Sequence, residues 1–149
     1  MRLSRAAVYA IRASLQLAEA PSGEPVPCRR LARAGEMPER FLLQVLRLMV
    51  NHGLLKSTRG VDGGYCLQRP AHEISLLHVV EATDGPITSD LPPMDGMPEW
   101  SQKRLIRVVQ DMTRAVSEQL AKTSLADLCS ASKSLSKSPG VESGWPITE

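Results

Sequence analysis

Residues 54–68 decide the fold of this chain, and they read Leu-Leu-Lys-Ser-Thr-Arg-Gly-Val-Asp-Gly-Gly-Tyr-Cys-Leu-Gln. Two short β-prone runs flank a glycine-rich turn, and a single arginine, Arg59, stands at the entrance of that turn. Asp-Gly-Gly at positions 62–64 tolerates positive φ, so the stretch predicts a β-hairpin. An amphipathic helix that ends at Gly53 comes directly before it. A helix followed at once by a small hairpin with a basic tip is typical of a winged helix-turn-helix, which binds DNA.

Working back from the hairpin, the sequence predicts two helices joined by a tight turn. The first covers residues 28–34 and stops at Gly35. Pro38 suits the first turn of the second helix. The apolar residues of that second helix are predicted to pack inward and are Phe41, Leu42, Val45, Leu46 and Met49. Its other face carries Arg40, Leu43, Gln44, Arg47 and Asn51. This pair of helices is the helix-turn-helix itself.

The remaining elements follow from caps and hydrophobic spacing. Ser4 can cap a helix over residues 5–19, in which Val8, Ile11, Leu15 and Ala18 form an apolar stripe. After the hairpin, Ser75 caps a helix over 76–83. We therefore predict a mainly α fold with a small β-hairpin wing. The predicted organisation is a DNA-binding domain at 1–83, a loop at 84–100, a dimerisation helix with a short final turn at 101–129, and a disordered tail at 130–149.

The long helix after the loop carries a continuous apolar stripe, and little chain follows that could cover it. It either folds back onto its own domain or crosses a second copy in a symmetric dimer, which suits the reading of paired half-sites. The residues predicted at that dimer interface are Trp100, Leu105, Val108, Val109, Met112, Val116 and Leu120.

Composition excludes several classes of function. Residues 1–70 contain eleven Lys and Arg against five Asp and Glu, whereas residues 71–149 contain seven against eleven. The basic N-terminal half suggests that it meets a polyanion. No apolar run approaches the roughly 20 residues of a membrane span, and three widely separated cysteines favour the cytoplasm. No catalytic constellation stands at a meaningful spacing, so an enzyme is not expected.

An ordered set of short motifs resembles one family. The set comprises Met-Arg-Leu-Ser at the start, Tyr9-Ala10, Pro-Val-Pro at 25–27, Arg59-Gly60 through Gly-Gly-Tyr at 63–65, Glu-Ile-Ser-Leu at 73–76 and Leu-Ala-Asp-Leu at 125–128. The chain resembles, over about residues 1–129, the bacterial winged-helix repressors typified by the iron–sulfur cluster regulator, the nitric-oxide-sensing repressor and the cysteine-metabolism repressor. The resemblance implies a homodimeric DNA-binding transcription regulator, usually a repressor, acting on double-stranded DNA at a pseudo-palindromic operator.

The resemblance also implies DNA contacts in the wing and in the second helix of the helix-turn-helix. The matching positions are Arg59 and Gly60 in the wing, and Glu39, Arg40, Phe41, Leu43, Gln44 and Arg47 in the helix. The chemistry agrees, because arginine suits guanine edges or a narrow minor groove and glutamine can pair with adenine. Phosphate contacts are expected from Arg2, Ser4 and Arg5. Leu43 departs from family members that carry a polar reader there.

Cluster-binding members carry three closely spaced cysteines in the loop, but residues 84–104 of this chain contain none. Cys28, Cys66 and Cys129 lie elsewhere at wide spacings, so we expect no iron–sulfur cluster, no cofactor and no metal. The effector stays open between thiol chemistry at Cys66 or Cys129, a small ligand at the dimer interface, and a complex with a metabolic enzyme. The alternative function is a degenerate family member that acts as a protein-interaction adaptor without DNA binding.

Overall fold

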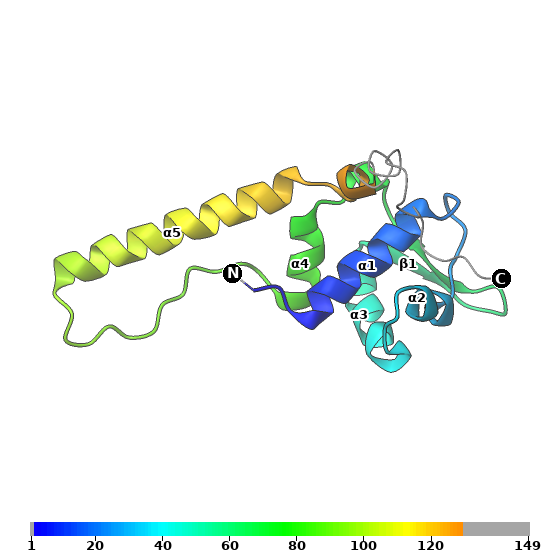
Figure 1. Cartoon of the computed structure of the whole chain (residues 1–149), viewed down its shortest axis with the longest axis horizontal. Helices are drawn as coiled ribbons and strands as arrows, with labels where there is room; N and C mark the ends of the chain where they lie inside the picture. The colour runs from blue at the N-terminus through cyan, green and yellow to red at the C-terminus, as the bar shows by residue number, and fades with distance from the viewer. Residues whose placement is uncertain (1, 130–149) are drawn as a thin grey trace, which may run out of the picture.

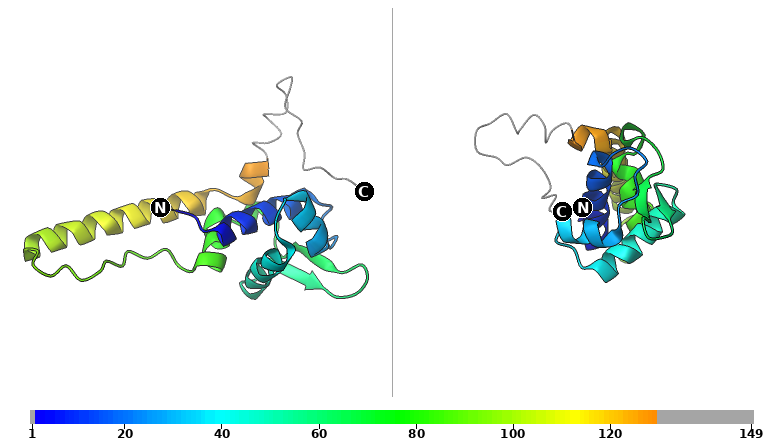
Figure 2. Two further views of the ribbon diagram at one scale, coloured as in Figure 1. Left: turned by 60° about the horizontal axis from the view of Figure 1, so that its bottom comes forward. Right: turned by 90° about the vertical axis from the view of Figure 1, so that its right-hand side faces the viewer.

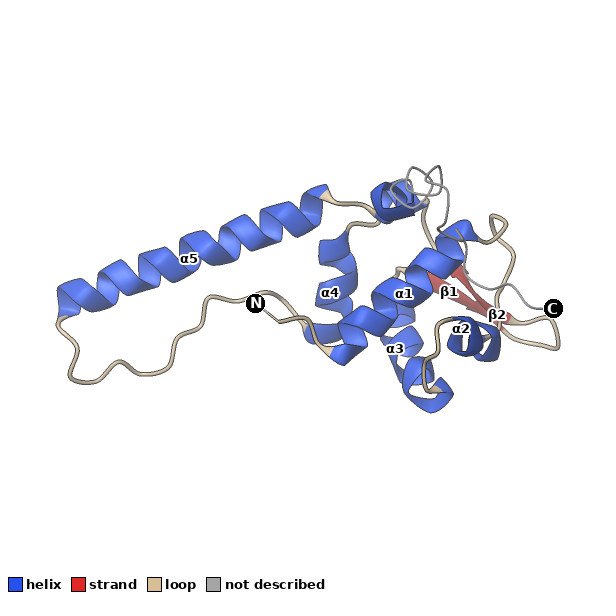
Figure 3. Ribbon diagram, viewed as in Figure 1, coloured by secondary structure: helices blue, strands red, loops and turns tan. Residues whose placement is uncertain are grey.

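The computed structural model describes residues 2–129, so the predicted tail at 130–149 lies outside the described residues. The elements in chain order are α1 (Arg5–Glu19), α2 (Cys28–Ala34), α3 (Glu39–Asn51), β1 (Leu55–Thr58), β2 (Gly64–Leu67), a 3-10 turn η1 (Ala71–Glu73), α4 (Leu76–Asp84) and α5 (Glu99–Lys122) (Figure 1). The predicted mainly helical fold with a two-stranded wing is confirmed (Figure 3).

The structure has two parts, which we call the body and the arm (Figure 2). The body comprises residues 4–84 together with a final helical turn at 125–129, and α1, α3 and α4 pack around one core within it. The largest fully buried side chains of that core include Leu31, Leu42, Leu46, Met49, Ile74 and Leu125. Because Leu125 is one of them, the end of the described chain belongs to the same core as the helix-turn-helix.

Helix α1 buries a different face from the apolar stripe that its sequence displays. Ala7, Ala10 and Ala13 are fully buried, whereas Val8 of the stripe is 40% exposed. Small side chains let α3 and α4 approach the axis of α1 closely. Ser14 shares the buried face because its hydroxyl donates to the carbonyl of Ala10 at 2.7 Å, which satisfies the buried polar group. The larger apolar residues of the stripe are left partly exposed.

The wing pairs β1 with β2 antiparallel, in a register that sets Leu55 opposite Leu67 and Thr58 opposite Gly64. The positive φ of the turn lies at Gly60 (φ 116°), so the expectation that residues 62–64 supply it is wrong. Position 64 requires glycine for a steric reason instead, because a Cβ there would lie 2.4 Å from the carbonyl of Val26. Val26 and Tyr65 exchange two backbone hydrogen bonds of 2.9 Å, which add a third strand-like segment to the wing.

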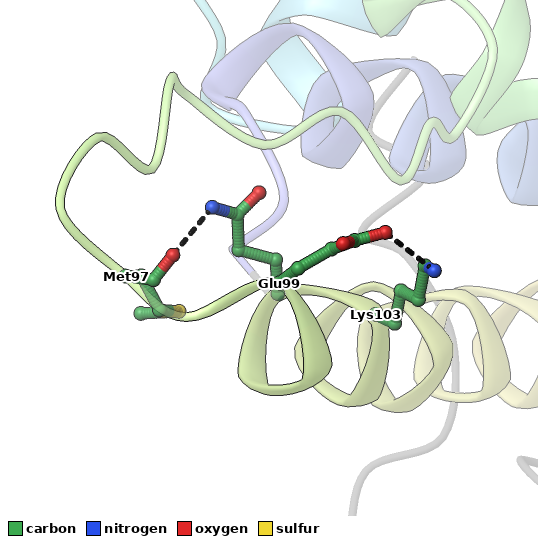
Figure 4. A network of polar contacts seen from close by, with 4 residues as sticks. Met97, Glu99 and Lys103 are labelled. Carbon is green, nitrogen blue, oxygen red and sulfur yellow. Dashed lines mark hydrogen bonds and ion pairs between the residues drawn. The ribbon is translucent and has the colours of Figure 1, made fainter.

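The arm comprises the loop at 85–98 and α5. The loop runs away from the body, and α5 returns from its far end (Figure 1). Helix α5 begins at Glu99, capped by Pro98, rather than at the predicted residue 101, so Trp100 lies inside the helix and not in the loop. Figure 4 shows how the first turn is held: the side-chain amide of Gln102 donates to the carbonyl of Met97 at 2.7 Å, and Lys103 pairs with Glu99 at 2.6 Å.

The arm rejoins the body through the backbone. Leu76 N–H donates to the carbonyl of Thr123 at 2.8 Å, and Leu125 N–H donates to the carbonyl of Ile74 at 2.9 Å. Ser75, whose hydroxyl accepts from His78 N–H at 3.2 Å, caps α4 between these two bonds as predicted. The end of the arm is therefore tied to the start of α4.

Candidate nucleic-acid interface

Helix α3 presents one polar face to solvent and one apolar face to the core. Arg40, Gln44 and Arg47 are exposed, and Leu43 beside them is half-buried. The opposite face is held by Leu42, Val45, Leu46 and Met49, all of which are buried. Because the core side is completely occupied, the three polar side chains project from a helix whose position is rigidly set, as a recognition helix requires.

Phe41 differs from the other predicted contacts of α3. Its ring is half-buried and stands edge-on against the ring of Tyr9, with centroids 5.6 Å apart and planes at 75°. Such a pair packs favourably. Phe41 therefore anchors the start of α3 to α1 and is less available to a ligand than its neighbours on the polar face.

The wing tip is the second predicted contact region, and it is open to solvent. Arg59 follows β1 directly and is exposed, while Gly60 takes the left-handed conformation after it. Gly63 N–H donates to the carbonyl of Gly60 at 3.1 Å and closes the turn. Val61 at the apex is fully exposed. The structure thus presents Arg59 at the entrance of a closed tip.

The wing and α3 meet at Tyr65 of β2. Burial raises the pKa of the Tyr65 hydroxyl, the neighbouring Cys28 thiol raises it further, and the guanidinium of Arg47 lowers it. These influences require Cys28 and Arg47 to lie near the same ring. Helix α3 packs against β1 of the wing, so the polar face of α3 adjoins the wing.

Cys28 is held against the start of α3. Its thiol lies 3.9 Å from the carbonyl of Glu39, and burial, together with the charge of Glu39, raises its pKa. A raised pKa keeps the thiol protonated and weakens it as a nucleophile. Cys28 and Cys66 are free thiols, and all three cysteines of the chain, Cys129 included, are partly buried.

Of the three predicted phosphate contacts near the N-terminus, Ser4 differs from Arg2 and Arg5 in its surroundings. Arg2 and Arg5 are exposed. The Ser4 hydroxyl, however, accepts from Ala7 N–H at 3.0 Å and donates to the carboxylate of Asp84. The Ser4 N–H also donates to Asp84, at 3.3 Å. The hydroxyl proton of Ser4 is therefore engaged within the protein. No local pattern of residues signals this contact, which spans eighty positions.

A further feature that sequence reasoning did not single out lies between α2 and α3. A shallow open hollow of about 300 Å³ is lined by Arg29, Ala32, Arg33, Glu36, Met37 and Glu39. Arg29 and Arg33 are four residues apart on α2, and residues at that spacing lie on the same side of a helix. This spacing is the signal in the sequence that could have identified the pair.

The arm carries the predicted dimer residues, and none of the residues of α5 is buried. Leu105, Val108 and Met112 are 37%, 48% and 63% exposed. The half-buried members of the stripe are Val109, Val116 and Leu120. At 3.6 residues per turn, Trp100 lies roughly 150° from the middle of this stripe. The structure therefore does not place Trp100 on the same face as the other six, and it is 72% exposed.

Comparisons with known proteins agree with this architecture. The profile of the Rrf2 family, described as "Iron-dependent Transcriptional regulator", matches residues 3–131. This chain belongs to the Rrf2 family. An HTH-type transcriptional regulator of Mycobacterium tuberculosis is 38% identical over 135 residues, covering 86% of this chain and 81% of that protein. CymR of Bacillus subtilis is 29% identical over 130 residues, covering 87% and 91%.

Solved structures show the same fold. CymR, the global cysteine regulator of B. subtilis, superposes with a TM-score of 0.72 at 27% identity, covering 88% of this chain and 98% of that one. IscR of T. potens superposes with a TM-score of 0.73 at 23% identity, covering 94% of each chain. This Rrf2 protein is thus a DNA-binding transcription regulator with a winged helix and is not an enzyme.

The family's description implies iron, so we tested whether the residues of this chain fit an iron centre. The loop at 85–98 offers only the carboxylates of Asp90 and Asp95 and contains no thiol or imidazole. Within residues 2–129, no three side chains of His, Cys, Asp or Glu converge as a metal site requires. The donor set therefore does not fit an iron–sulfur cluster. Among the described helices, none has the length and apolar character needed to cross a membrane.

Proposed function

We propose that this Rrf2 protein is a cytoplasmic, homodimeric transcriptional repressor that binds a pseudo-palindromic operator without an iron–sulfur cluster. The observation that carries the proposal is the combination of two surfaces in one small chain. One is the polar face of α3 continuous with the wing, and the other is an arm whose apolar stripe has no cover among the described residues. A dimer that occupies an operator can block transcription by its presence alone. The proposed repression therefore needs no further domain or site.

In the proposed complex, α3 enters the major groove. Arg40 and Arg47 face guanine edges or adjoining phosphates, and Gln44 pairs with adenine. Leu43 contributes an apolar contact to a thymine methyl, and Glu39 lies at the start of the helix, where it accepts from a cytosine amine. Phe41 contributes by holding the helix against Tyr9.

The wing and the N-terminus complete the contact. Arg59 enters a groove from the wing tip, and Gly60 lets the backbone pass close to the DNA because it carries no side chain. Arg2 and Arg5 reach phosphates, which position the protein without specifying sequence. Ser4 supports them indirectly, since its hydroxyl caps α1 and ties the N-terminus to Asp84.

The proposed dimer forms through α5. Leu105, Val108, Val109, Met112, Val116 and Leu120 meet the same residues of a second copy across a two-fold axis. Trp100 is not part of this contact, because it lies roughly 150° from the middle of the stripe. The half-exposed stripe of α1, which includes Val8, offers further apolar surface beside it. At 1.5 Å per residue, α5 is roughly 36 Å long, comparable to the ~34 Å between half-sites one DNA turn apart.

Selection of labelled genomic fragments, followed by footprinting, tests the DNA contacts. We expect Arg59→Ala and Gln44→Ala each to weaken operator binding by roughly 1–3 kcal/mol and to relax preference at one position. Leu48→Ala, a change at an exposed residue of α3 outside the proposed contact set, is the matched control and should bind like the parent. In transcription from a selected promoter, added protein should lower the yield of transcript.

The opposite results separate the two functions. If the parent protein retains no genomic fragment, DNA binding is absent and the adaptor function replaces the repressor. If the parent binds but Arg59→Ala and Arg40→Ala both bind equally well, the proposed docking is wrong.

Anaerobic purification tests the cluster. We expect a colourless protein without stoichiometric iron or sulfide, because the loop at 85–98 has no thiol. Visible absorption and iron analysis measure this directly. A brown protein with near-stoichiometric iron would contradict the prediction and would require ligands from two subunits.

A further inference from the structure

Helix α2 carries two exposed arginines that the proposed docking does not use. Arg29 and Arg33 are both exposed and stand on the same side of α2, where they form one rim of the hollow between α2 and α3. The other rim is formed by Glu36 and Glu39. Within residues 2–129 the structure gives neither guanidinium an ion pair, although exposed pairs form elsewhere, as between Arg114 and Asp111.

The placement of α2 decides what these arginines can reach. Its opposite side is anchored in the core by Leu31, which is 1% exposed, and the buried Ala32 lines the hollow between the two arginines. The hollow ends at Glu39, the first residue of α3, so the two arginines flank the end of the helix whose polar face enters the groove. In a helix-turn-helix the helix before the recognition helix crosses the sugar–phosphate backbone. Side chains on that helix meet phosphates rather than base edges.

We propose that Arg29 and Arg33 bind consecutive phosphates of one DNA strand at the edge of the major groove that α3 enters. The proposal rests on DNA binding as proposed above. A guanidinium forms paired, charge-assisted hydrogen bonds to phosphate oxygens, and two of them four residues apart act as a clamp. Glu36 and Glu39 on the opposite rim keep the phosphate at the arginine rim, because like charges repel. Arg30, which does not line the hollow, is not part of the clamp.

The clamp has a measurable electrostatic signature. Each neutralised phosphate contributes roughly 0.9 to the slope of log affinity against log salt on duplex DNA. Loss of two contacts should therefore flatten the slope by about two. Over a fourfold rise in salt, the parent should then lose roughly tenfold more affinity than the variant does. This loss is independent of sequence, unlike the loss expected at Gln44.

The experiment measures fluorescence anisotropy of one labelled duplex of arbitrary sequence, titrated with protein over about 50 to 200 mM salt. The variant is Arg29→Gln/Arg33→Gln. The matched control is Arg107→Gln/Arg114→Gln, which removes the same charge from exposed arginines of α5 on the face opposite the apolar stripe. Circular dichroism melting verifies that each variant folds. We expect both variants to fold, because the substituted side chains are exposed.

We expect the α2 variant to flatten the slope by about two and the α5 variant to keep the parent's slope. The proposal is overturned if the α2 variant keeps the parent's slope, or if both variants flatten it equally, which would make net charge the cause. If the parent binds no duplex at any salt concentration, the proposed function itself has failed. If the parent binds the duplex and the α2 variant keeps the parent's salt slope, only the clamp is overturned and the proposed DNA binding stands.

Discussion

The body buries a core of apolar residues, whereas the arm leaves its apolar residues exposed or half-buried. In the body, Leu42, Ile74 and Leu125 are fully buried, and the core extends through every helix of the helix-turn-helix. In the arm, none of the residues of α5 is buried, and Met112 in the middle of its stripe is 63% exposed. The body therefore holds the core that stabilises a fold, whereas the arm displays an apolar surface that no other described part of the chain covers.

The difference explains what each part can do alone. A helix gains most of its stability from packing of its apolar face. Within residues 2–129, α5 packs against α4, and the segment directly after α5 is tied to the start of α4 by backbone hydrogen bonds of Thr123 and Leu125. At the other end of α4, Asp84 is bonded to Ser4 at the N-terminus. Helix α4 therefore joins the end of the arm to the first predicted DNA contacts, so the geometry of a dimer would be transmitted to the DNA-binding surface.

The largest expected effect comes from breaking the proposed seam. Val109→Glu/Met112→Glu should convert dimers to monomers, because each buried apolar side chain contributes on the order of 1.5–3 kcal/mol and two are lost from each protomer. The dissociation constant should rise by a factor of a thousand or more, which corresponds to roughly 4 kcal/mol. Sedimentation velocity measures the change, and circular dichroism should show an intact body.

The control for the seam places the same charges on the other face of α5. Gln110→Glu/Ala121→Glu alters two exposed residues on that face, changes the net charge by the same amount and should leave the dimer intact. A Val109→Glu/Met112→Glu protein that still sediments as a dimer would place the seam elsewhere on the molecule.

The next effect separates the core of the body from the apolar stripe of the arm. Leu125→Ala should cost roughly 2–5 kcal/mol of unfolding free energy, because it leaves a cavity in a closed core. Met112→Ala removes a side chain that is 63% exposed in the protomer. Its cost should therefore appear only at protein concentrations where dimers form. Urea unfolding at several protein concentrations measures both. Equal and concentration-independent costs would mean that the body and the arm are not separate.

Periodicity predicted α3, because the helix buries the residues whose spacing identifies them. The wing was predicted from the glycine-rich turn between two β-prone runs. Periodicity failed at α1, where the buried face includes three alanines and Leu17 rather than the predicted stripe of Val8, Ile11, Leu15 and Ala18. Ala7, Ala10 and Ala13 are buried because α1 approaches its neighbours too closely for larger side chains. Apolar spacing reveals a stripe but not which of two faces the neighbouring helices will meet.

The site could be predicted in part. Exposure of Arg40, Gln44 and Arg59 agrees with the predicted contact surface. Arg40 and Gln44 lie on α3 away from its buried residues, and Arg59 follows the end of β1. The Ser4–Asp84 contact joins residues eighty positions apart and depends on how α1 meets α4. Gly64 was assigned to turn conformation, but it is needed for its approach to Val26. Such contacts across the fold leave no periodic signal in the sequence.

The smallest expected effect lies at the junction of the arm and the body. Ser124 and Asp127 form a reciprocal cap on the final turn: Ser124 N–H donates to the Asp127 carboxylate at 2.8 Å, and Asp127 N–H donates to the Ser124 hydroxyl at 3.2 Å. The bond from the Ser124 backbone, then the bond from its hydroxyl, lowers the pKa of Asp127 below its ordinary value of 3.8. A lowered folded pKa means that the ionised carboxylate stabilises the folded state. That contribution is complete above the ordinary value and is lost as pH falls through the lowered one.

Asp127→Asn keeps an acceptor at the cap but removes this charge. The parent should be slightly more stable than the variant at neutral pH, and the difference should shrink as pH falls below 3.8. Thermal unfolding of both proteins across that range measures the difference. Asp127 is fully exposed, so the effect should be small and weaker in high salt. If the difference in stability between the parent and the variant instead grew toward low pH, it would have the wrong sign for a carboxylate held in its ionised form. The charge of Asp127 would then not stabilise the cap that ties the arm to the body.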